Sequence, residues 1–262
     1  MLNIQGISPK TKPSKVLYIS DLLNSSNQLF IGLSETWLRD QLDAELHIDN
    51  YKLFRTDHTR TRNCRFGRDS GGVAIYLRSD LAPAFEQVIS HSDGNVEACG
   101  VYSKSENIFI VVLYRQPDDR KGGNRSTEQQ FLQVTNSIQN FINSISPTPD
   151  IILGGDFNLP HAKWDSFTHK SGASLDEQRM INIMRHICND NAMLQVIKSS
   201  THQRGNILDL VFTNNTDLIH SYQCNETLRS ISDHYIIELA TGYKTSYQES
   251  AYEPRSPLSP LD

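Results

Sequence analysis

The chain has 262 residues, of which 37% are hydrophobic, and its 25 Lys and Arg against 30 Asp and Glu give a formal net charge of −5. This length is sufficient for one large α/β domain with a sizeable core. A mildly acidic composition argues weakly against nucleic-acid binding, because attraction to phosphates usually appears as a basic excess. The longest apolar run, residues 108–114, is far too short to span a bilayer.

The ends and the cysteines indicate an intracellular protein without a membrane segment. The first residues lack the basic start and apolar core of a signal peptide. The four cysteines are scattered without any short pairing, at Cys64, Cys99, Cys188 and Cys224. This spacing favours free thiols over a disulfide framework or a zinc site.

Short apolar runs alternate with segments of helical periodicity, which is typical of an α/β domain. In chain order we expect a helix at 16–23, strands at 29–33, 72–77 and 108–114, a helix at 131–145, a strand at 151–153, a helix after Ser174, and strands at 207–212 and 234–239. The second helix begins with a capping box of Ser126 and Gln129. The inner face of the third would hold Met180, Ile183, Met184 and Ile187.

Two segments lack such a pattern. Residues 52–78 are loop-like in their first half and strongly basic. After Gly242 the chain holds Ser, Tyr and three prolines with little apolar surface to bury, which predicts a linker or a disordered tail. We therefore expect one domain over residues 1–242 and a tail over 243–262.

Polar side chains follow the predicted strands where each strand ends. Asp156 and Asn158, two apart after the strand at 151–153, project the same way from an extended chain and could hold a water and a phosphate oxygen together. The alternative is a turn closed by Asx hydrogen bonds. In Ser232-Asp233-His234, the carboxylate and imidazole could bind a metal or a phosphate, whereas a turn Asp beside a surface His is the structural alternative.

Two further carboxylates stand beside or within apolar strands. Glu35 is a hard oxygen donor of the kind that Mg²⁺ prefers, although a Glu at a helix N-terminus is also common. Asp209 lies inside an apolar strand, where an unpaired carboxylate is costly, so it needs a partner. A histidine that it orients, as in a catalytic dyad, and a structural salt bridge are both consistent with this position. Together the four motifs indicate a Mg²⁺-dependent phosphodiester site.

In this order, Asn3, Glu35, Tyr114, Gly155-Asp156-Phe157-Asn158, Asp209 and Ser232-Asp233-His234 resemble the endonuclease/exonuclease/phosphatase superfamily, which includes pancreatic deoxyribonuclease and the apurinic/apyrimidinic repair endonucleases. A closer resemblance is to the endonuclease domains of non-LTR (LINE-type) retrotransposons. Its carriers are Ser34-Glu35-Thr36-Trp37-Leu38, Gly71-Gly72-Val73-Ala74-Ile75-Tyr76, Tyr114-Arg115-Gln116-Pro117, Gly155 to His161, Leu208 to Thr213 and Ser232-Asp233-His234.

The resemblance implies a DNase I-like four-layer α/β sandwich, two packed mixed sheets flanked by helices, and it assigns roles. Glu35, Asn3 and Asp233 would hold Mg²⁺, or Mn²⁺ in its place. Asp156 would position or deprotonate the attacking water, and Asn158 and Tyr114 would contact the phosphate. His234, oriented by Asp209, would stabilise the transition state. Asn3 lies near the start of the chain, which predicts a short first strand, and Gln5 stands where a second acid would support the metal.

The implied activity is nicking of double-stranded DNA, and the 3′-hydroxyl left at the nick would prime reverse transcription in the nucleus. A reverse transcriptase domain would follow in the natural polypeptide. A phosphodiesterase or phosphatase acting on lipids or inositol phosphates is one alternative, and a catalytically inactive DNA-binding module is another. Expected DNA contacts are Arg60, Arg62, Arg65, Arg115, Thr201 and Arg204.

The basic segment changes the first interpretation of the charge. Residues 51–78 carry a net charge of +5, and the remainder of the chain carries −10. A basic loop beside the Glu35 strand could follow a DNA backbone, with an affinity that falls as salt rises. The alternative is a solvated loop without a partner. The acidic total is therefore an average over two unlike parts.

Overall fold

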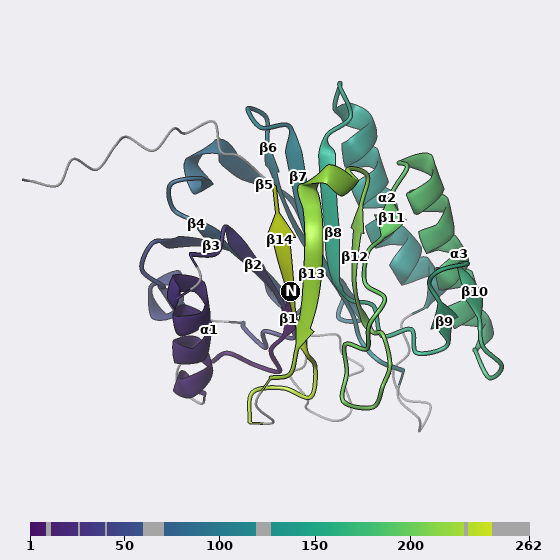
Figure 1. Cartoon of the computed structure of the whole chain (residues 1–262), viewed down its shortest axis with the longest axis horizontal. Helices are drawn as coiled ribbons and strands as arrows, with labels where there is room; N and C mark the ends of the chain where they lie inside the picture. The colour runs from purple at the N-terminus through teal and green to yellow at the C-terminus, as the bar shows by residue number, and fades with distance from the viewer. Residues whose placement is uncertain are drawn as a thin grey trace, which may run out of the picture.

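The computed structural model describes residues 1–8, 12–25, 27–39, 41–59, 71–118, 127–227 and 230–242. Two β-sheets pack face to face, and helices cover their outer faces, as Figure 1 shows. The four-layer α/β sandwich expected from the resemblance is confirmed. None of the described helices is both long and apolar enough to cross a membrane. The tail expected from residue 243 lies outside the described residues.

The first sheet has the strand order β1-β2-β4-β3, with bounds Leu2–Asn3, Phe30–Ser34, Val73–Arg78 and Tyr51–Thr56. β1 pairs with β2 in parallel, and the other pairs are antiparallel. A hairpin of β13 (Ile219–Asn225) and β14 (Ile236–Thr241) lies beside β1, because Met1 and Ile237 exchange two backbone hydrogen bonds. The short first strand is thus held between β2 and β14.

The second sheet has the order β11-β12-β8-β7-β6-β5, with bounds Leu194–Gln195, Asp209–Thr213, Asp150–Asp156, Ile108–Arg115, Val96–Ser103 and Phe85–Ser92. Only β7 and β8 pair in parallel, and α2 (Glu128–Ser144) forms the connection that a parallel pair requires. β7 is buried along its whole length, as its continuous run of β-branched and aromatic residues predicts. A small hairpin of β9 (Ala162–Lys163) and β10 (Thr168–His169) lies outside this sheet.

Three apolar clusters fill the spaces between the layers. One lies between the sheets and includes Ile75, Val112 and Val211. A second joins the six-stranded sheet to α2 and α3 (Leu175–Asp190), and a third joins the first sheet to α1 (Pro13–Ser25). The sheets approach closely at Gly32, where an added Cβ would overlap Met1 and Val112. Cys99, Cys188 and Cys224 are free thiols.

Several expectations from the sequence need correction. Residues 51–56 form strand β3, so the prediction of a loop from residue 52 is wrong here; Tyr51 packs in the cluster beside α1, and Phe54 on the opposite face packs between the sheets. The cap of α2 is Thr127 with Gln130, one residue after the expected pair. The inner face of α3 includes Ile181, and Ile183 is only partly buried. β5, β6 and β13 were not predicted because polar residues interrupt them.

Candidate active site

Three buried polar side chains lie in one row across the six-stranded sheet. Tyr114 at the end of β7 pairs in register with Asp156 on β8, and Asp156 pairs with Asp209 on β12. The exposed fractions of these residues are 2% or less. Side chains at paired positions project to the same face of a sheet. The register therefore brings together three residues that are far apart in the chain, at the end of the interface between the sheets.

Gly155 determines how closely β8 approaches β7 just before Asp156. Its φ of +135° lies in the region that favours glycine, and an added Cβ would overlap the carbonyl group of Leu113. Both the backbone conformation and the close packing against Leu113 therefore require a glycine at this position. It lets Asp156 enter the site from a strand that stays paired on both sides.

Asp156 is the most densely hydrogen-bonded acid of the site. Its Oδ2 accepts the amide groups of Asn3, at 2.8 Å, and Asn158, at 2.9 Å, while its Oδ1 accepts the backbone N–H of Asn158 at 3.0 Å. Burial and the nearby charge of Asp209 raise the pKa of Asp156 to about 8, against the opposing effect of His234. Without a bound cation Asp156 therefore holds a proton at neutral pH, and its carboxylate form can act as a base once that proton is displaced.

His234 and Asp209 form a buried dyad. The distance from Nδ1 of His234 to Oδ2 of Asp209 is 2.7 Å, and Nε2 lies 3.8 Å from Oδ2 of Asp156. Burial favours the neutral ring, but Asp209 and Asp156 outweigh it and raise the pKa of His234 to about 10. The imidazolium is thus the form present at neutral pH, as a donor to an anionic phosphate requires. Asp209 thus has the histidine partner that was expected for it, and the contact is consistent both with an orienting role and with a structural salt bridge.

Glu35 lies on the opposite side of Asp156 from His234. Its Oε1 accepts a hydrogen bond from Nδ2 of Asn3 at 3.1 Å and from the hydroxyl of Tyr114 at 3.0 Å. Burial and the charges of Glu35 and Asp156 raise the pKa of Tyr114 well above its usual value, so the phenol keeps its proton. Asn3 donates to both Glu35 and Asp156 and so joins the two acids.

The short N-terminal strand is firmly anchored. Two lysines of the first helix region donate to the carbonyl of Gln5, Lys12 at 2.5 Å and Lys15 at 2.9 Å. Lys15 is buried and also donates to the carbonyls of Ile4 and Ile231. Burial lowers the pKa of Lys15 to about 8. Asn3 is therefore held in place although only two residues precede it, and neither lysine was identified from the sequence.

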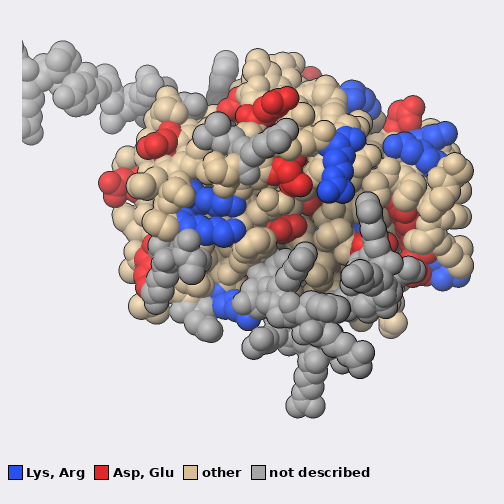
Figure 2. All heavy atoms as spheres, turned by 90° about the horizontal axis from the view of Figure 1, so that it is seen from below, with Lys and Arg blue, Asp and Glu red and all other residues tan. Residues whose placement is uncertain are grey.

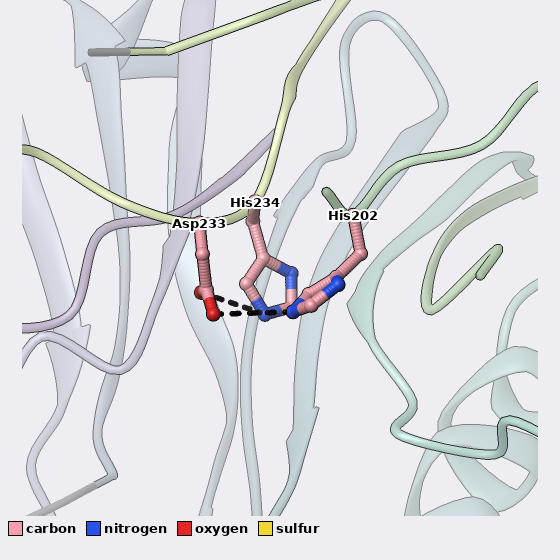
Figure 3. Close-up of side chains that lie close together, drawn as sticks. All are labelled: His202, Asp233 and His234. Carbon is pink, nitrogen blue, oxygen red and sulfur yellow. Dashed lines mark ion pairs between the residues drawn. The ribbon is translucent and has the colours of Figure 1, made fainter. Parts of the chain in front are cut away.

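Asp233 is held by two neutral donors. Nε2 of Gln5 donates to Oδ1 of Asp233 at 2.7 Å, so Gln5 supports this acid in place of a second carboxylate. Nε2 of His202 lies 3.2 Å from Oδ2 of Asp233 (Figure 3), and the His202 ring meets that of His234 edge to face. Nδ1 of His202 accepts the backbone N–H of Arg204, which leaves the proton on Nε2.

Sequence reasoning missed His202, although it lies between Thr201 and Arg204, two of the expected DNA contacts. Burial lowers the pKa of His202, with a further contribution from His234. A one-residue antiparallel bridge to His234 brings the ring into the site. No local signal of that pairing exists in the sequence, because its partner is more than thirty positions away.

The donor set can hold a metal ion. Two groups of acids and histidines converge, one of His202, Asp233 and His234 and one of Asp156, Asp209 and His234. The charged ring of His234 has no lone pair to give, so the carboxylates of these groups are the candidate ligands. Glu35 adds a further carboxylate beside Asp156, with Asn3 between them. Repulsion from Asp209 and Glu35 contributes to the raised pKa of Asp156, and a divalent cation among these acids would relieve it. The residues present therefore fit a hard divalent cation.

Two of the expected DNA contacts have other surroundings. Thr201 is fully buried, and its hydroxyl accepts the backbone N–H groups of Leu208 and Asp209 at 2.9 and 3.0 Å. Arg115 is 1% exposed. It donates to the carbonyl of Asn158 at 2.7 Å and in turn accepts Nδ2 of Asn158 on its own carbonyl. These buried side chains cannot reach a DNA backbone. Their hydrogen bonds instead hold Asp209 and Asn158 in position.

Arg204 is exposed, as a DNA contact must be. Arg60, Arg62 and Arg65 lie outside the described residues. Figure 2 views the end of the molecule below the sheets of Figure 1, where acidic side chains lie near the middle of the face and Lys and Arg on both sides of them. Within the basic segment, Arg55 pairs with Asp43 and Asp57, so not all of its charge is available to a ligand.

Comparison with known proteins agrees with this geometry. Residues 108–238 match the family described as endonuclease-reverse transcriptase. The chain belongs to this family. The matched part runs from β7 through Asp156 and Asp209 to His234, and so includes the row of Tyr114, Asp156 and Asp209 and the dyad. A search of curated protein sequences finds no match.

Solved structures confirm the DNase I-like fold of the family. The endonuclease domain of TRAS1, a telomere-specific non-LTR retrotransposon, matches with a TM-score of 0.56 and 16% identity over 90% of this chain and 93% of that domain. The 3′ phosphatase NExo from Neisseria, bound to a product DNA hairpin, matches with a TM-score of 0.62 and 15% identity over 92% of this chain and 97% of that protein. The AP endonuclease LMAP from Leishmania major matches with a TM-score of 0.58 and 14% identity over 90% of this chain and 85% of that protein.

Proposed function

We propose that this domain is a Mg²⁺-dependent endonuclease that nicks double-stranded DNA by hydrolysis. The observation that carries the proposal is the short distance between a proton acceptor, Asp156, and a proton donor, His234. Asp156 can accept a proton there once a bound cation has displaced the proton it holds at neutral pH, and Nε2 of His234, 3.8 Å away, carries a proton to donate. Hydrolysis of a phosphodiester needs both, because a water must lose a proton while negative charge grows on the phosphate.

Each residue of the site has a part in this scheme. Asp156 orients the attacking water and takes its proton, with Asn3 and Asn158 fixing the carboxylate. His234 donates to a non-bridging oxygen of the phosphate, and Asp209 keeps its ring oriented and charged. The water oxygen bonds to phosphorus as the bond between phosphorus and the 3′ oxygen breaks, and the 3′ oxygen takes a proton from solvent. This leaves a 3′-hydroxyl and a 5′-phosphate. Tyr114, with a protonated hydroxyl, is a further donor toward the phosphate.

Glu35, Asn3 and Asp233 are the residues that would hold Mg²⁺, or Mn²⁺ in its place. The bound cation would supply positive charge to the phosphate and to the leaving oxygen. Asn158 currently uses Nδ2 for both Arg115 and Asp156, so contact with a phosphate oxygen requires release of one of these bonds. The amide remains close to the acid in either arrangement.

The family supports a retrotransposon setting for this reaction. A 3′-hydroxyl at a nicked chromosomal site primes reverse transcription, so we propose a reverse transcriptase domain in the natural polypeptide and action in the nucleus. DNA would be held by Arg204 and by Arg60, Arg62 and Arg65. The family description and the likeness to the TRAS1 endonuclease domain support this setting.

Nicking of supercoiled plasmid tests the proposal. The parent protein should convert supercoiled to open-circular DNA with Mg²⁺ and not with EDTA, and a DNA polymerase should extend the nicks without prior treatment. Glu35→Ala, Asp156→Ala and His234→Ala should each abolish nicking. Parent-like nicking by all three variants would contradict the site assignment.

The same experiment separates the alternatives. Release of phosphate from an inositol phosphate, without nicking, would indicate a phosphatase. DNA binding that needs no Mg²⁺, again without nicking, would indicate an inactive binding module. The complete set of acids and the charged His234 favour the active enzyme over that module.

A further inference from the structure

The row of buried polar residues has a fourth member on β6. Glu97 pairs in register with Tyr114, so the row across β6, β7, β8 and β12 reads Glu97, Tyr114, Asp156, Asp209. Glu97 is 1% exposed. Its charge also contributes to the raised pKa of Tyr114, which places the carboxylate near the same face.

Each member of the row has a partner from outside the six-stranded sheet. His234 contacts Asp209, Asn3 contacts Asp156, and Glu35 contacts Tyr114. Glu97 contacts His58, with 2.5 Å between Oε1 and Nδ1 of the imidazole, and both side chains are 1% exposed. The site thus has an acid–histidine pair at each end of the row. The chemistry described above uses only the Asp209–His234 pair.

The second oxygen of Glu97 binds the backbone of Gly71-Gly72, the two residues just before β4. Oε2 accepts the backbone N–H of Gly72 at 2.6 Å. Gly71 and Gly72 have φ values of +136° and +83°, and a Cβ on Gly71 would overlap His58 and Glu97, while one on Gly72 would overlap Thr36. These glycines are therefore required both by their backbone conformation and by the close approach of the acid–histidine pair.

Gly71 and Gly72 in turn bind the loop that carries Glu35. The carbonyl of Gly72 accepts the N–H of Thr36 at 3.1 Å, and that of Gly71 accepts the N–H of Trp37 at 2.8 Å. Glu35 itself has a φ of +53°, a left-handed conformation that is strained for a glutamate. Its carbonyl accepts the N–H of Gly6 at 2.7 Å, so the loop is fixed from two sides.

We propose that Glu97 and His58 are positioning residues that hold Glu35 in its metal-binding conformation through Gly71 and Gly72. The inference rests on the proposed role of Glu35 as a metal ligand. The buried Oε2 of Glu97 accepts the N–H of Gly72 and so fixes this segment, and His58 pairs with Oε1, which would otherwise be buried without a partner. Neither residue touches the reacting phosphate.

Three variants of Glu97 separate positioning from general stability. Glu97→Met fills the space but accepts no hydrogen bond from Gly72. Glu97→Asp keeps the charge but is one methylene too short to reach both partners. Glu97→Gln keeps an acceptor for Gly72 and should restore parent behaviour. The matched control is Glu177→Met on α3, because Glu177 likewise accepts a backbone N–H and the Nδ1 of a histidine, His161, at 2.8 Å each.

Two measurements on the DNA-free protein report the effect without reference to activity. Amide hydrogen exchange of Thr36 and Trp37 should become about tenfold faster in Glu97→Met, since their acceptors are no longer fixed. The Kd for Mn²⁺, measured by titration calorimetry, should rise about tenfold, as is usual when a residue behind a metal ligand is lost. Glu97→Asp should show both changes at smaller size, which keeps the test decisive if Glu97→Met does not fold.

The outcomes are distinguishable. Parent-like exchange and Mn²⁺ affinity in Glu97→Met or Glu97→Asp would overturn the inference, as would equal changes in Glu177→Met. Faster exchange with unchanged Mn²⁺ affinity would also overturn it, because Glu35 would then bind metal without this support. A parent protein that binds Mn²⁺ but does not nick DNA would refute the proposed function alone.

Discussion

Nδ1 of His234 lies 2.7 Å from Oδ2 of Asp209, although 25 positions separate the two residues in the chain. Both side chains are buried, so the pair meets in a region of low dielectric where its attraction is only weakly screened. Oγ of Ser232 accepts the backbone N–H of His234 at 3.0 Å, and Thr227 donates to the carbonyl of the same residue. The ring is therefore fixed at both its side chain and its backbone.

Replacing Asp209 with Asn should inactivate the enzyme while preserving its shape. The amide cannot stabilise the imidazolium and favours the wrong tautomer, so the nicking rate should fall by about 10³-fold or more. Plasmid nicking at saturating Mg²⁺ measures this loss, and Asp190→Asn at the exposed end of α3 is the control. A rate within tenfold of the parent would show that Asp209 is only structural.

Metal affinity should depend on pH through Asp156. Its pKa of about 8, raised from 3.8 by burial and by Asp209, means that the metal-free protein holds a proton there below that pH. Cation binding must then displace the proton, so affinity should fall as pH falls below about 8, by at most about tenfold per pH unit. Titration with Mn²⁺ from about pH 6 to 9 measures the slope. Asp156→Asn should bind more weakly and lose the slope, and a parent protein without any slope would contradict the prediction.

Arg115→Met should lower the nicking rate and leave the salt dependence of DNA binding unchanged. The guanidinium is buried against the carbonyl of Asn158 and pairs with Asp118, so its loss frees Asn158 and removes no phosphate contact. A lost phosphate contact would instead reduce the slope of log K against log salt by about 1. Fluorescence anisotropy with a labelled duplex at several salt concentrations decides between these outcomes.

Thr201→Val should destabilise the protein next to Asp209 of the Asp209–His234 dyad. The hydroxyl accepts two backbone N–H groups, from Leu208 and Asp209, and valine has the same shape without an acceptor. Leaving buried N–H groups unpaired costs about 1–3 kcal/mol each, so the free energy of unfolding should fall by about this amount or more. Urea unfolding measures the change, and Thr201→Ser, which keeps the hydroxyl, should lie closer to the parent. Equal stability of both variants would refute this role.

The joint variant Arg60→Ala, Arg62→Ala and Arg65→Ala should weaken DNA binding and lower its salt slope. Up to three phosphate contacts would be lost, with a slope change of about 0.9 for each. The matched control is Arg179→Ala with Arg185→Ala, since both side chains are exposed on α3, away from the site. If affinity and slope stay at their parent values, the basic segment is not the DNA contact.

Most site residues were predictable because they occur in compact motifs at strand ends. Asp156, Asn158, Asp233 and His234 each stand next to an apolar run, where a strand must end and polar groups can project. Their partners were not predictable in the same way. His202 and Glu97 are polar residues in segments whose apolar pattern is interrupted, so neither a site nor a buried strand could be recognised there.

Burial changed the interpretation of two residues. Thr201 and Arg115 are residue types that commonly contact DNA, and only the packing around them shows that they support Asp209 and Asn158 from inside the protein. The loop prediction over residues 51–56 failed for a related reason. β3 pairs with β4, and the polar residues Lys52, Arg55 and Thr56 interrupt its apolar ones, so it lacks a continuous apolar run.

The sequence by itself determined the alternation of strands and helices, the identity of the acids and of His234, and the family to which they belong. Only the tertiary structure decided which residues stand side by side. The row from Glu97 to Asp209 depends on strand register, and a shift of one residue in any pair would turn its side chains to the other face of the sheet. Register arises from the packing of both sheets together, and no single segment of the chain contains that information.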